Sequence, residues 1–421
     1  MEAGPNHARI RVLDHIGISF FWLAYNFHWG ALLAIVLPSQ VAAIVGDARK
    51  ELYNGLVASL GAAVSLVATP LAGALSDRSS SRFGRRRPFM AVGTGINIAV
   101  LALMAGFGAG SGIWLFLICY LGVQLGNNWS GGPYAGLIPD VVPRGERGTA
   151  SGWLALMTAA GLLLGAVAAG RLVRGESYGP VYAAIAVVLA LALAVTLWRV
   201  KERRLAEDPG LFRMGAFLRS FLLTGAAYRD FYFVLMTRAL VSMGIYSVFT
   251  FFQFFLKDVV RVENPVLQTS NLVAIIIAAG IPTSLVAGSL SDRYGRKPLV
   301  YLSGALMALA SLVFIIVGFH PSLSLMFWIS AVFGLGYGAY QAADWALAVD
   351  VLPKSGAAAK DMGIWHVSLV LPQMIAPLLT GVTLSAFKGA SLLLGYTVVF
   401  ALTAAWFILG TVFVRQIRGA R

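Results

Sequence analysis

The chain has 421 residues, of which 58% are hydrophobic and only 12% are charged. An ordinary soluble domain carries about a quarter of charged residues, so this composition excludes a soluble globular fold and predicts a membrane protein with lipid as a partner. The formal net charge of +14 would suit nucleic-acid binding in a soluble chain. We expect no nucleic acid here, because the basic residues concentrate in loops between apolar segments.

A helix needs about 20 mostly apolar residues to cross the roughly 30 Å of bilayer hydrocarbon. Twelve segments meet this requirement, and the stretch VYAAIAVVLALALAVTLW lacks the alternation of a β-barrel strand. We therefore predict an all-α membrane protein with twelve transmembrane helices. They cover about residues 16 to 44, 53 to 75, 89 to 109, 113 to 139, 150 to 171, 179 to 198, 231 to 256, 268 to 290, 298 to 319, 323 to 349, 363 to 386 and 391 to 414.

Lysine and arginine are distributed unequally between alternating loops. Most of the 32 basic residues fall in segments that share a side of the membrane with both termini. Since positive charge accumulates in cytoplasmic loops, we predict that both termini are cytoplasmic. The short loops and the alanine-, glycine- and arginine-rich composition favour a multi-pass protein of a bacterial inner membrane.

Two short motifs recur about half a chain apart. GALSDRSSSRFGRRRPF follows the second segment and GSLSDRYGRKPLV follows the eighth, so Asp77 matches Asp292. LIPDVVP and LAVDVLP follow the fourth and tenth segments, so Asp140 matches Asp350. Parallel repeats are typical of transporters that rock two bundles around a midplane site. We predict two pseudo-symmetric six-helix bundles, residues 1–198 and 231–421, and a cytoplasmic linker at 199–230.

The repeated motif G-x-L-S-D-R-x-G-R-K/R-P resembles the signature loop of the major facilitator superfamily. The longer copy SDRSSSRFGRRRPF, together with NNWSGGPYAGLIPD in the fourth segment, is similar to the matching segments of plant sucrose–proton symporters and their animal and bacterial relatives. The resemblance implies a secondary active transporter that moves a sugar or glycoside by alternating access, with H+ as the coupling ion and no bound cofactor or metal. We expect a functional monomer, because one chain carries both halves.

In that superfamily the signature loop latches the cytoplasmic ends of the two bundles together. Glycines there permit close backbone approach and turn conformations, and aspartates can pair with arginines or accept from helix N-terminal amides. The latch would form when the site faces outward and break when it faces inward; alternatively, the arginines only mark the cytoplasmic side. The gating candidates are Gly73, Asp77, Gly84, Arg85, Asp140, Gly288, Asp292, Arg293, Gly295, Arg296 and Asp350.

Ionisable side chains within the segments are few, and such groups are usually functional because burying them in lipid is costly. Asp344 is the only acid well inside a segment and Arg238 is the only base. A rise of 1.5 Å per residue places them at similar depths, so they could form an ion pair that protonation of Asp344 opens. A purely structural pair is the alternative. His28 and His366 are further coupling candidates, since histidine titrates near neutrality.

The sequence departs from its sucrose-transporting relatives at one position. The acid that the resemblance associates with proton coupling falls on Gln124, which cannot titrate. The second segment also has no carboxylate between Glu51 and Asp77, so the paired acids of melibiose-type symporters are absent. Facilitated diffusion, or coupling through Asp344 or a histidine, therefore stays open.

Neutral polar groups near the midplane, flanked by aromatic rings, are the substrate candidates. They suit an uncharged polyol better than an anion. The amides could instead form interhelical hydrogen bonds, the rings could pack in the core, and the histidine could be structural. The candidates are Asn26, His28, Gln124, Asn127, Asn128, Trp129, Tyr134, Tyr337, Tyr340, Gln341 and Trp345.

Two other function classes were weighed. An exporter of amphipathic compounds, or a lysolipid carrier, is the second hypothesis, because 25 Phe, 11 Met and 10 Trp could line an apolar cavity. A membrane enzyme would need a nucleophile with its base, a metal cluster or paired acids. The sequence shows no such spacing, so we expect a transporter and not an enzyme.

Overall fold

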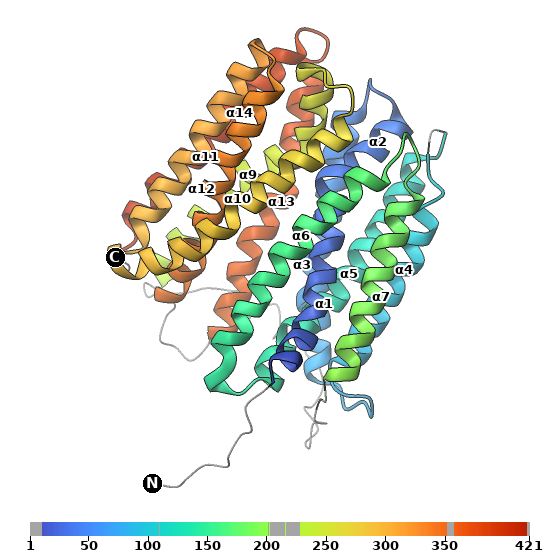
Figure 1. Cartoon of the computed structure of the whole chain (residues 1–421), viewed down its shortest axis with the longest axis vertical. Coiled ribbons are helices and arrows are strands. Elements are labelled where there is room, and N and C mark those ends of the chain that lie inside the picture. The colour runs from blue at the N-terminus through green and yellow to red at the C-terminus, as the bar shows by residue number, and fades with distance from the viewer. Residues whose placement is uncertain are drawn as a thin grey trace.

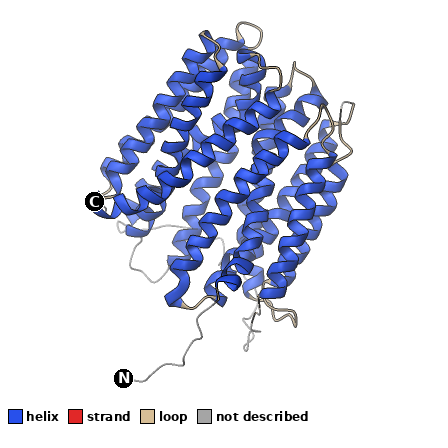
Figure 2. Cartoon of the chain, in the orientation of Figure 1, coloured by secondary structure: helices blue, strands red, loops and turns tan. Residues whose placement is uncertain are grey.

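The structure, a computed structural model, describes residues 11–108, 110–200, 202, 215, 228–351 and 358–418. Within these ranges, residues 138, 144, 147, 292, 349, 358–364 and 366 are described by their backbone alone. The described residues form helices joined by short loops, with no strand among them (Figure 2). The predicted linker at 199–230 lies largely outside the described residues.

The helices fall into two sets along the chain. The first set comprises α1 (Val12–Ala31), η1 (Leu32–Val36), α2 (Leu37–Val45), α3 (Lys50–Asp77), α4 (Arg87–Met104), α5 (Ile113–Val141), η2 (Arg144–Glu146), α6 (Arg147–Leu172) and α7 (Gly179–Arg199). The second comprises α9 (Arg229–Phe255), η4 (Leu256–Val260), α10 (Pro265–Tyr294), α11 (Arg296–Phe319), α12 (Leu323–Asp350), α13 (Ala358–Phe387), α14 (Leu392–Phe413) and η5 (Val414–Gln416).

Each of the twelve predicted segments coincides with one helical run, which confirms the all-α membrane fold. Inside a bilayer the helix satisfies every backbone group of the segment internally. Eleven runs among the described residues are long and apolar enough to cross a membrane. The remaining run, α5, has 29 residues but is less apolar, because Gln124, Asn127 and Asn128 interrupt it. The least apolar span is therefore the one that carries polar site candidates.

The helices of each set pack mainly on one another. In the first set α1 packs on α6 and α7, and α5 packs on α3 and α4. In the second set α12 packs on α10 and α11, and α14 packs on α9 and α11. The sets meet where α3 lies along α13 and α6 lies along α10 (Figure 1). This arrangement is consistent with two six-helix bundles, called the first and second half below; their exact boundaries stay a prediction.

Corresponding helices of the two halves share a backbone irregularity. The first run passes from α1 into the π-helical segment η1, and the seventh run ends in the π-helical segment η4. Both lie toward the end of the molecule opposite the termini, which we call the far end. Such π turns often occur at functional sites. The internal repeat read from the loops therefore extends to the backbone of the helices.

Candidate functional site

A buried ion pair joins two helices of the second half. Arg238 of α9 contacts the Asp344 carboxylate of α12 through Nη1 and Oδ2, and their side chains are 9% and 3% exposed. The Tyr340 hydroxyl donates to the other carboxylate oxygen at 3.2 Å, and the Arg238 guanidinium lies 3.4 Å from the ring centroid of Trp365. The structure thus brings together the two charges that the sequence places at equal depth.

Three aromatic rings of the first half form a stack. Trp22 and Tyr25 of α1 lie with centroids 4.7 Å apart and planes 6° apart. Tyr134 of α5 stacks on the other side of Trp22, at 5.3 Å and 9°. The Tyr134 hydroxyl donates to the Ile18 carbonyl at 3.0 Å, which fixes its ring. Sequence reasoning found Tyr134 but missed Trp22 and Tyr25.

Asn128 is the polar centre of the first half. Its Oδ1 accepts hydrogen bonds from Thr69 at 3.1 Å and from Tyr25 at 3.4 Å. Its amide nitrogen donates to the backbone and side-chain oxygens of Gln124 at 2.8 and 3.1 Å, and Gln124 donates in turn to Tyr120 at 2.9 Å. Asn128 therefore ties α1, α3 and α5 together beside the aromatic stack.

Tyrosines link these two groups across the halves. The Tyr246 hydroxyl of α9 accepts from the Gln373 amide of α13 at 2.5 Å. Tyr25 of the first half interacts electrostatically with Tyr246, and both Tyr246 and Tyr337 interact with Arg238. We call this set of residues, contributed by α1, α5, α9 and α12, the central site: Trp22, Tyr25, Asn128, Arg238, Tyr246, Tyr337 and Asp344.

Three predicted substrate residues point elsewhere. Asn127 accepts a hydrogen bond from Asn97 of α4 at 3.2 Å, and Trp129 stacks on Phe89 of α4 at 6.3 Å. Asn26 donates to a carbonyl four residues earlier in its own helix at 2.8 Å. Because each residue turns the helix by about 100°, the neighbours of Asn128 face α4 instead. The structure corrects their assignment to the central site.

His28 is completely buried in α1. Its ring lies edge-on to Trp29 with centroids 4.6 Å apart, and neither ring nitrogen has a hydrogen-bond partner among the described residues. Burying polar atoms without partners is costly. The geometry thus gives His28 no contact with the Arg238–Asp344 pair, and its roles in binding and coupling stay predictions.

Several predicted residues lie at the margin of the description or of the site. The side chains of Asp292 and His366 are outside the described part of the chain. Gln341 and Arg293 are exposed. Trp345 is 54% exposed and reaches the ion pair only through an edge-on contact, 5.1 Å between centroids, with the tryptophan that covers the guanidinium.

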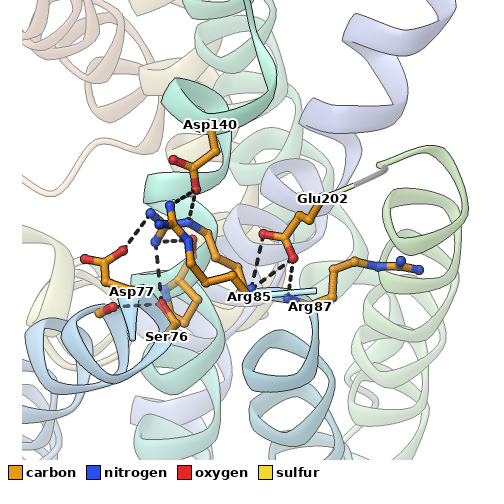
Figure 3. Close-up of polar contacts among 9 residues, drawn as sticks. Ser76, Asp77, Arg85, Arg87, Asp140 and Glu202 are labelled. Atoms are coloured by element: carbon orange, nitrogen blue, oxygen red, sulfur yellow. Dashed lines mark hydrogen bonds and ion pairs between the residues drawn. The ribbon is translucent and has the colours of Figure 1, made fainter. Parts of the chain in front are cut away.

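The first signature loop is centred on Arg86 (Figure 3). Its guanidinium bridges two acids, with Nη2 2.7 Å from Asp77 Oδ1 and Nε 2.6 Å from Asp140 Oδ2. Arg85 contacts Asp140 as well. The Arg86 side chain is 7% exposed and that of Arg85 is 21% exposed. Sequence reasoning selected Arg85, whereas the buried bridge is Arg86, because adjacent residues of the loop point in different directions.

The second signature loop repeats this arrangement. Arg296 Nε lies 3.2 Å from Asp350 Oδ2, and Arg296 Nη1 donates to Ser291 at 2.5 Å. These partners match Asp140 and Ser76 around Arg86. In each half the described loop contacts stay within that half, so the predicted latch between halves is not the arrangement seen here and stays a prediction for the opposite conformation.

The four signature glycines behave differently. Gly84 and Gly295 have φ of +108° and +93°, the left-handed region that favours glycine. A Cβ on Gly288 would meet nothing within 4 Å, and one on Gly73 would lie 3.8 Å from Gly132. The expected close approach at Gly73 and Gly288 is therefore wrong, because α3 and α5 approach most closely at Gly132 instead.

Three ion pairs connect the halves at the far end, and each takes one residue from either half. They are Asp47–Lys257, Lys50–Asp258 and Glu51–Lys388, each with a nitrogen–oxygen distance of 2.6 Å. We call these six residues the far-end clamp. The Lys50 and Glu51 side chains are only 2% and 1% exposed. Sequence reasoning missed the clamp, although two adjacent charges directly before an apolar span were a signal.

Close backbone contact accompanies the clamp. A Cβ on Gly55 of α3 would lie 2.4 Å from the Pro377 carbonyl oxygen of α13, and one on Gly381 would lie 2.5 Å from the Glu51 carbonyl oxygen. On the other side of the molecule, the Ser270 hydroxyl of α10 donates to the Ala166 carbonyl of α6 at 2.8 Å. The two halves are thus closed against each other at the far end.

The clamp is expected to withstand mild acid. The hydrogen bond from Lys257, opposed by burial and aided by Lys50, lowers the pKa of Asp47 from 3.8 to about 2. A depressed pKa stabilises the paired state above the ordinary pKa and loses that effect as the pH falls through the lowered value. The contribution of Asp47 is therefore complete at neutral pH and is lost between about pH 4 and pH 2.

We expect the far end to stay closed when the pH falls from about 7.5 to about 5. A spin-label pair on Glu176→Cys and Ala390→Cys, in a Cys119→Ser background, measures the separation of the halves there. All three positions are single changes outside the clamp, and Cys119 is the sole native cysteine. Widening of the label distance at pH 5 would contradict this prediction.

A family model described as "Major Facilitator Superfamily" matches residues 16–360 and, in a second match, residues 265–419. The curated relatives include "Multidrug resistance protein MdtG" of Escherichia coli (strain K12 / DH10B), 34% identical over 190 residues, and the same-named protein of Escherichia fergusonii, 35% identical over 188 residues. Each match covers 43% of this chain and 43% of the relative, so less than half of the relatives' length is spanned.

Solved structures share the fold over nearly the whole chain. A bacterial homologue of the human lysosomal transporter Spinster, in an inward-facing and unoccupied conformation, has a TM-score of 0.70 at 18% identity and covers 97% of this chain and 99% of its own. The nucleoside transporter NupG also has a TM-score of 0.70, at 14% identity, with coverages of 97% and 99%. At these identities the likeness shows the fold alone.

Proposed function

The chain belongs to the major facilitator superfamily and is a multi-pass membrane transporter, and from this premise we propose that it carries a small uncharged solute, a sugar or glycoside, together with protons. The observation that carries the substrate class is the flat stack of Trp22, Tyr25 and Tyr134 beside Asn128. Aromatic faces pack against the apolar face of a sugar ring. Amide groups such as Asn128 and Gln373 hydrogen-bond its hydroxyls.

The coupling device is the Arg238–Asp344 pair. Protonation removes the charge of Asp344 and with it the attraction to Arg238. The Tyr340 hydroxyl and the Trp365 ring hold the two partners in place. Tyr246 and Tyr337 connect the pair to the central site, so loss of the ion pair acts directly on residues that contact the solute. We take H+ as the coupling ion for this reason.

The proposed cycle uses two gates. With both termini in the cytoplasm of a bacterial inner membrane, the far end faces outward and the far-end clamp closes the outer gate. The two signature loops rest on their own halves in this inward-facing state. In the outward-facing state the clamp separates and the loops engage the opposite half. One chain supplies both gates, so a monomer completes the cycle.

A second candidate is export of amphipathic compounds. It is favoured by one observation, the similarity to two proteins named as multidrug resistance proteins. The aromatic stack of the central site also suits flat apolar solutes. The two candidates differ in direction and in solute, so one transport assay separates them.

The test is transport by purified protein in proteoliposomes. Radiolabelled sucrose, maltose and glucose are offered with and without an inward-directed pH gradient, and efflux of a fluorescent amphipathic cation is followed in parallel. Saturable, gradient-stimulated sugar uptake supports the proposal. Dye extrusion without sugar uptake would replace it with the second candidate.

Adjacent asparagines provide a matched pair of variants. Asn128→Ala removes a hydrogen-bonding group of the central site and is expected to raise KM for the sugar about tenfold, since one hydrogen bond is worth about 1 kcal/mol. Asn127→Ala breaks the contact with Asn97 on the α4 side, so it is expected to lower the melting temperature without raising KM. Uptake kinetics and thermal unfolding measure both. Equal KM for the two variants would argue against the central site.

A further inference from the structure

Glu202 holds the beginning of α4. Its carboxylate accepts hydrogen bonds from the backbone amide of Arg86, at 3.2 Å to Oε1 and 2.9 Å to Oε2, and from that of Arg87 at 3.2 Å (Figure 3). Arg86 is the N-cap residue of α4, and its own side chain makes no capping hydrogen bond. A carboxylate at this position satisfies free amides and complements the helix dipole. The cap of this helix therefore comes from a residue more than 100 positions later in the chain.

The signature glycine makes room for this contact. Gly84 has a φ of +108°, and a Cβ there would lie 2.5 Å from Glu202 Oε2. Any other residue would push the carboxylate away from the amides. The Arg87 guanidinium also donates to the Leu197 carbonyl near the end of α7 at 2.6 Å. The loop between α3 and α4 and the chain that leaves α7 are thus fastened to each other.

Arg86 is consequently held from two directions. Its guanidinium bridges Asp77 and Asp140, both of the first half, while its backbone amide is bound by Glu202. Together these contacts keep the signature loop on its own half in the state in which the far end is closed. The second signature loop has no such cap: α11 begins after Gly295, and no side chain caps it. The device is therefore specific to the first loop.

We propose that Glu202 is a positioning residue of the gating cycle, which acts through Arg86. By fixing the first signature loop on its own half, it stabilises the conformation with a closed far end, and its contact must loosen before the loop can reach the second half. Glu202 lies three residues beyond the end of α7, on the covalent connection to α9, so movement of the second half reaches this contact early. The inference rests on the alternating-access part of the proposed function and is independent of the solute.

The experiment measures the equilibrium between the two conformations without any solute. Glu202→Ala is introduced into the Glu176→Cys, Ala390→Cys, Cys119→Ser protein, with Lys257→Ala added to every sample so that both conformations are populated. Loss of a helix cap predicts a roughly 2- to 30-fold rise in the ratio of open to closed far end. Glu202→Gln is expected to fall between the two, because its amide oxygen still accepts but carries no charge.

The matched control is Glu263→Ala, an exposed acid in a loop of the second half, which is expected to leave the ratio unchanged. Thermal unfolding of each sample shows that the variants are folded. A folded Glu202→Ala protein with an unchanged ratio, or with a more closed far end, would overturn the proposal and leave Glu202 as a helix cap only. A Gly55→Leu protein in the same background separates this failure from a failure of alternating access, because it must open the far end whatever Glu202 does.

Discussion

Asp344→Asn is expected to abolish accumulation of solute against its gradient. One pH unit corresponds to 1.36 kcal/mol, so a wild-type symporter with one proton per solute accumulates its solute up to about tenfold under such a gradient. Asparagine keeps the size of the side chain but cannot bind or release a proton. The variant should therefore equilibrate the solute to a ratio of about one. Uptake into proteoliposomes with an imposed pH gradient measures this ratio.

The arginine partner provides the matched comparison. Arg238→Gln leaves the Asp344 carboxylate buried and unpaired, which is expected to cost about 3–5 kcal/mol of stability. The double variant Arg238→Gln, Asp344→Asn removes both charges and should recover most of that loss. Neither should accumulate solute. Gradient-driven accumulation that survives in Asp344→Asn would remove Asp344 from the coupling mechanism and leave the pair a structural one.

Gly55→Leu is expected to prevent closure of the far end and to stop transport. The added side chain would meet the carbonyl oxygen of Pro377, which as part of the backbone cannot move aside. Overpacking of this kind costs about 1–3 kcal/mol. Since only the closed conformation has this contact, its population should fall by roughly 5- to 150-fold. The spin-label pair at the far end and solute uptake report the two effects.

Gly95→Leu is the control for this variant. Gly95 lies in α4, is exposed, and would place a Cβ with nothing within 4 Å. The substitution adds the same side chain to a membrane helix without touching the second half. It is expected to leave both the label distance and transport unchanged. If Gly55→Leu also left them unchanged, the closed far end would not be a stage of the transport cycle.

The sequence predicts best what depends on one helix at a time. Length and hydropathy locate the helical runs, because a bilayer demands a segment of fixed length. The depth of a side chain follows from the rise per residue, and charges are rare inside the membrane. These two facts were enough to pair Arg238 with Asp344 before their contact was seen. The repeat also matched Asp140 with Asp350, and their arginine partners proved equivalent.

What the sequence could not predict depends on how helices face one another. Asn127 and Asn128 are adjacent, and only the rotation of α5 against its neighbours decides that Asn128 meets α1 and α3. The far-end clamp needs Lys50 and Glu51 to meet residues more than 200 positions away, and no local pattern encodes such a pairing. The same holds for Glu202, which caps a helix that begins far earlier in the chain.

The central claim, that an uncharged solute moves together with a proton through Asp344, is tested most directly by recording proton flux when solute is added. Proteoliposomes containing a trapped pH-sensitive dye and no imposed gradient are mixed with external sucrose, maltose or glucose. The account predicts that a transported sugar acidifies the interior in the wild type and causes no pH change in Asp344→Asn. Sugar entry into wild-type vesicles without any acidification would contradict it.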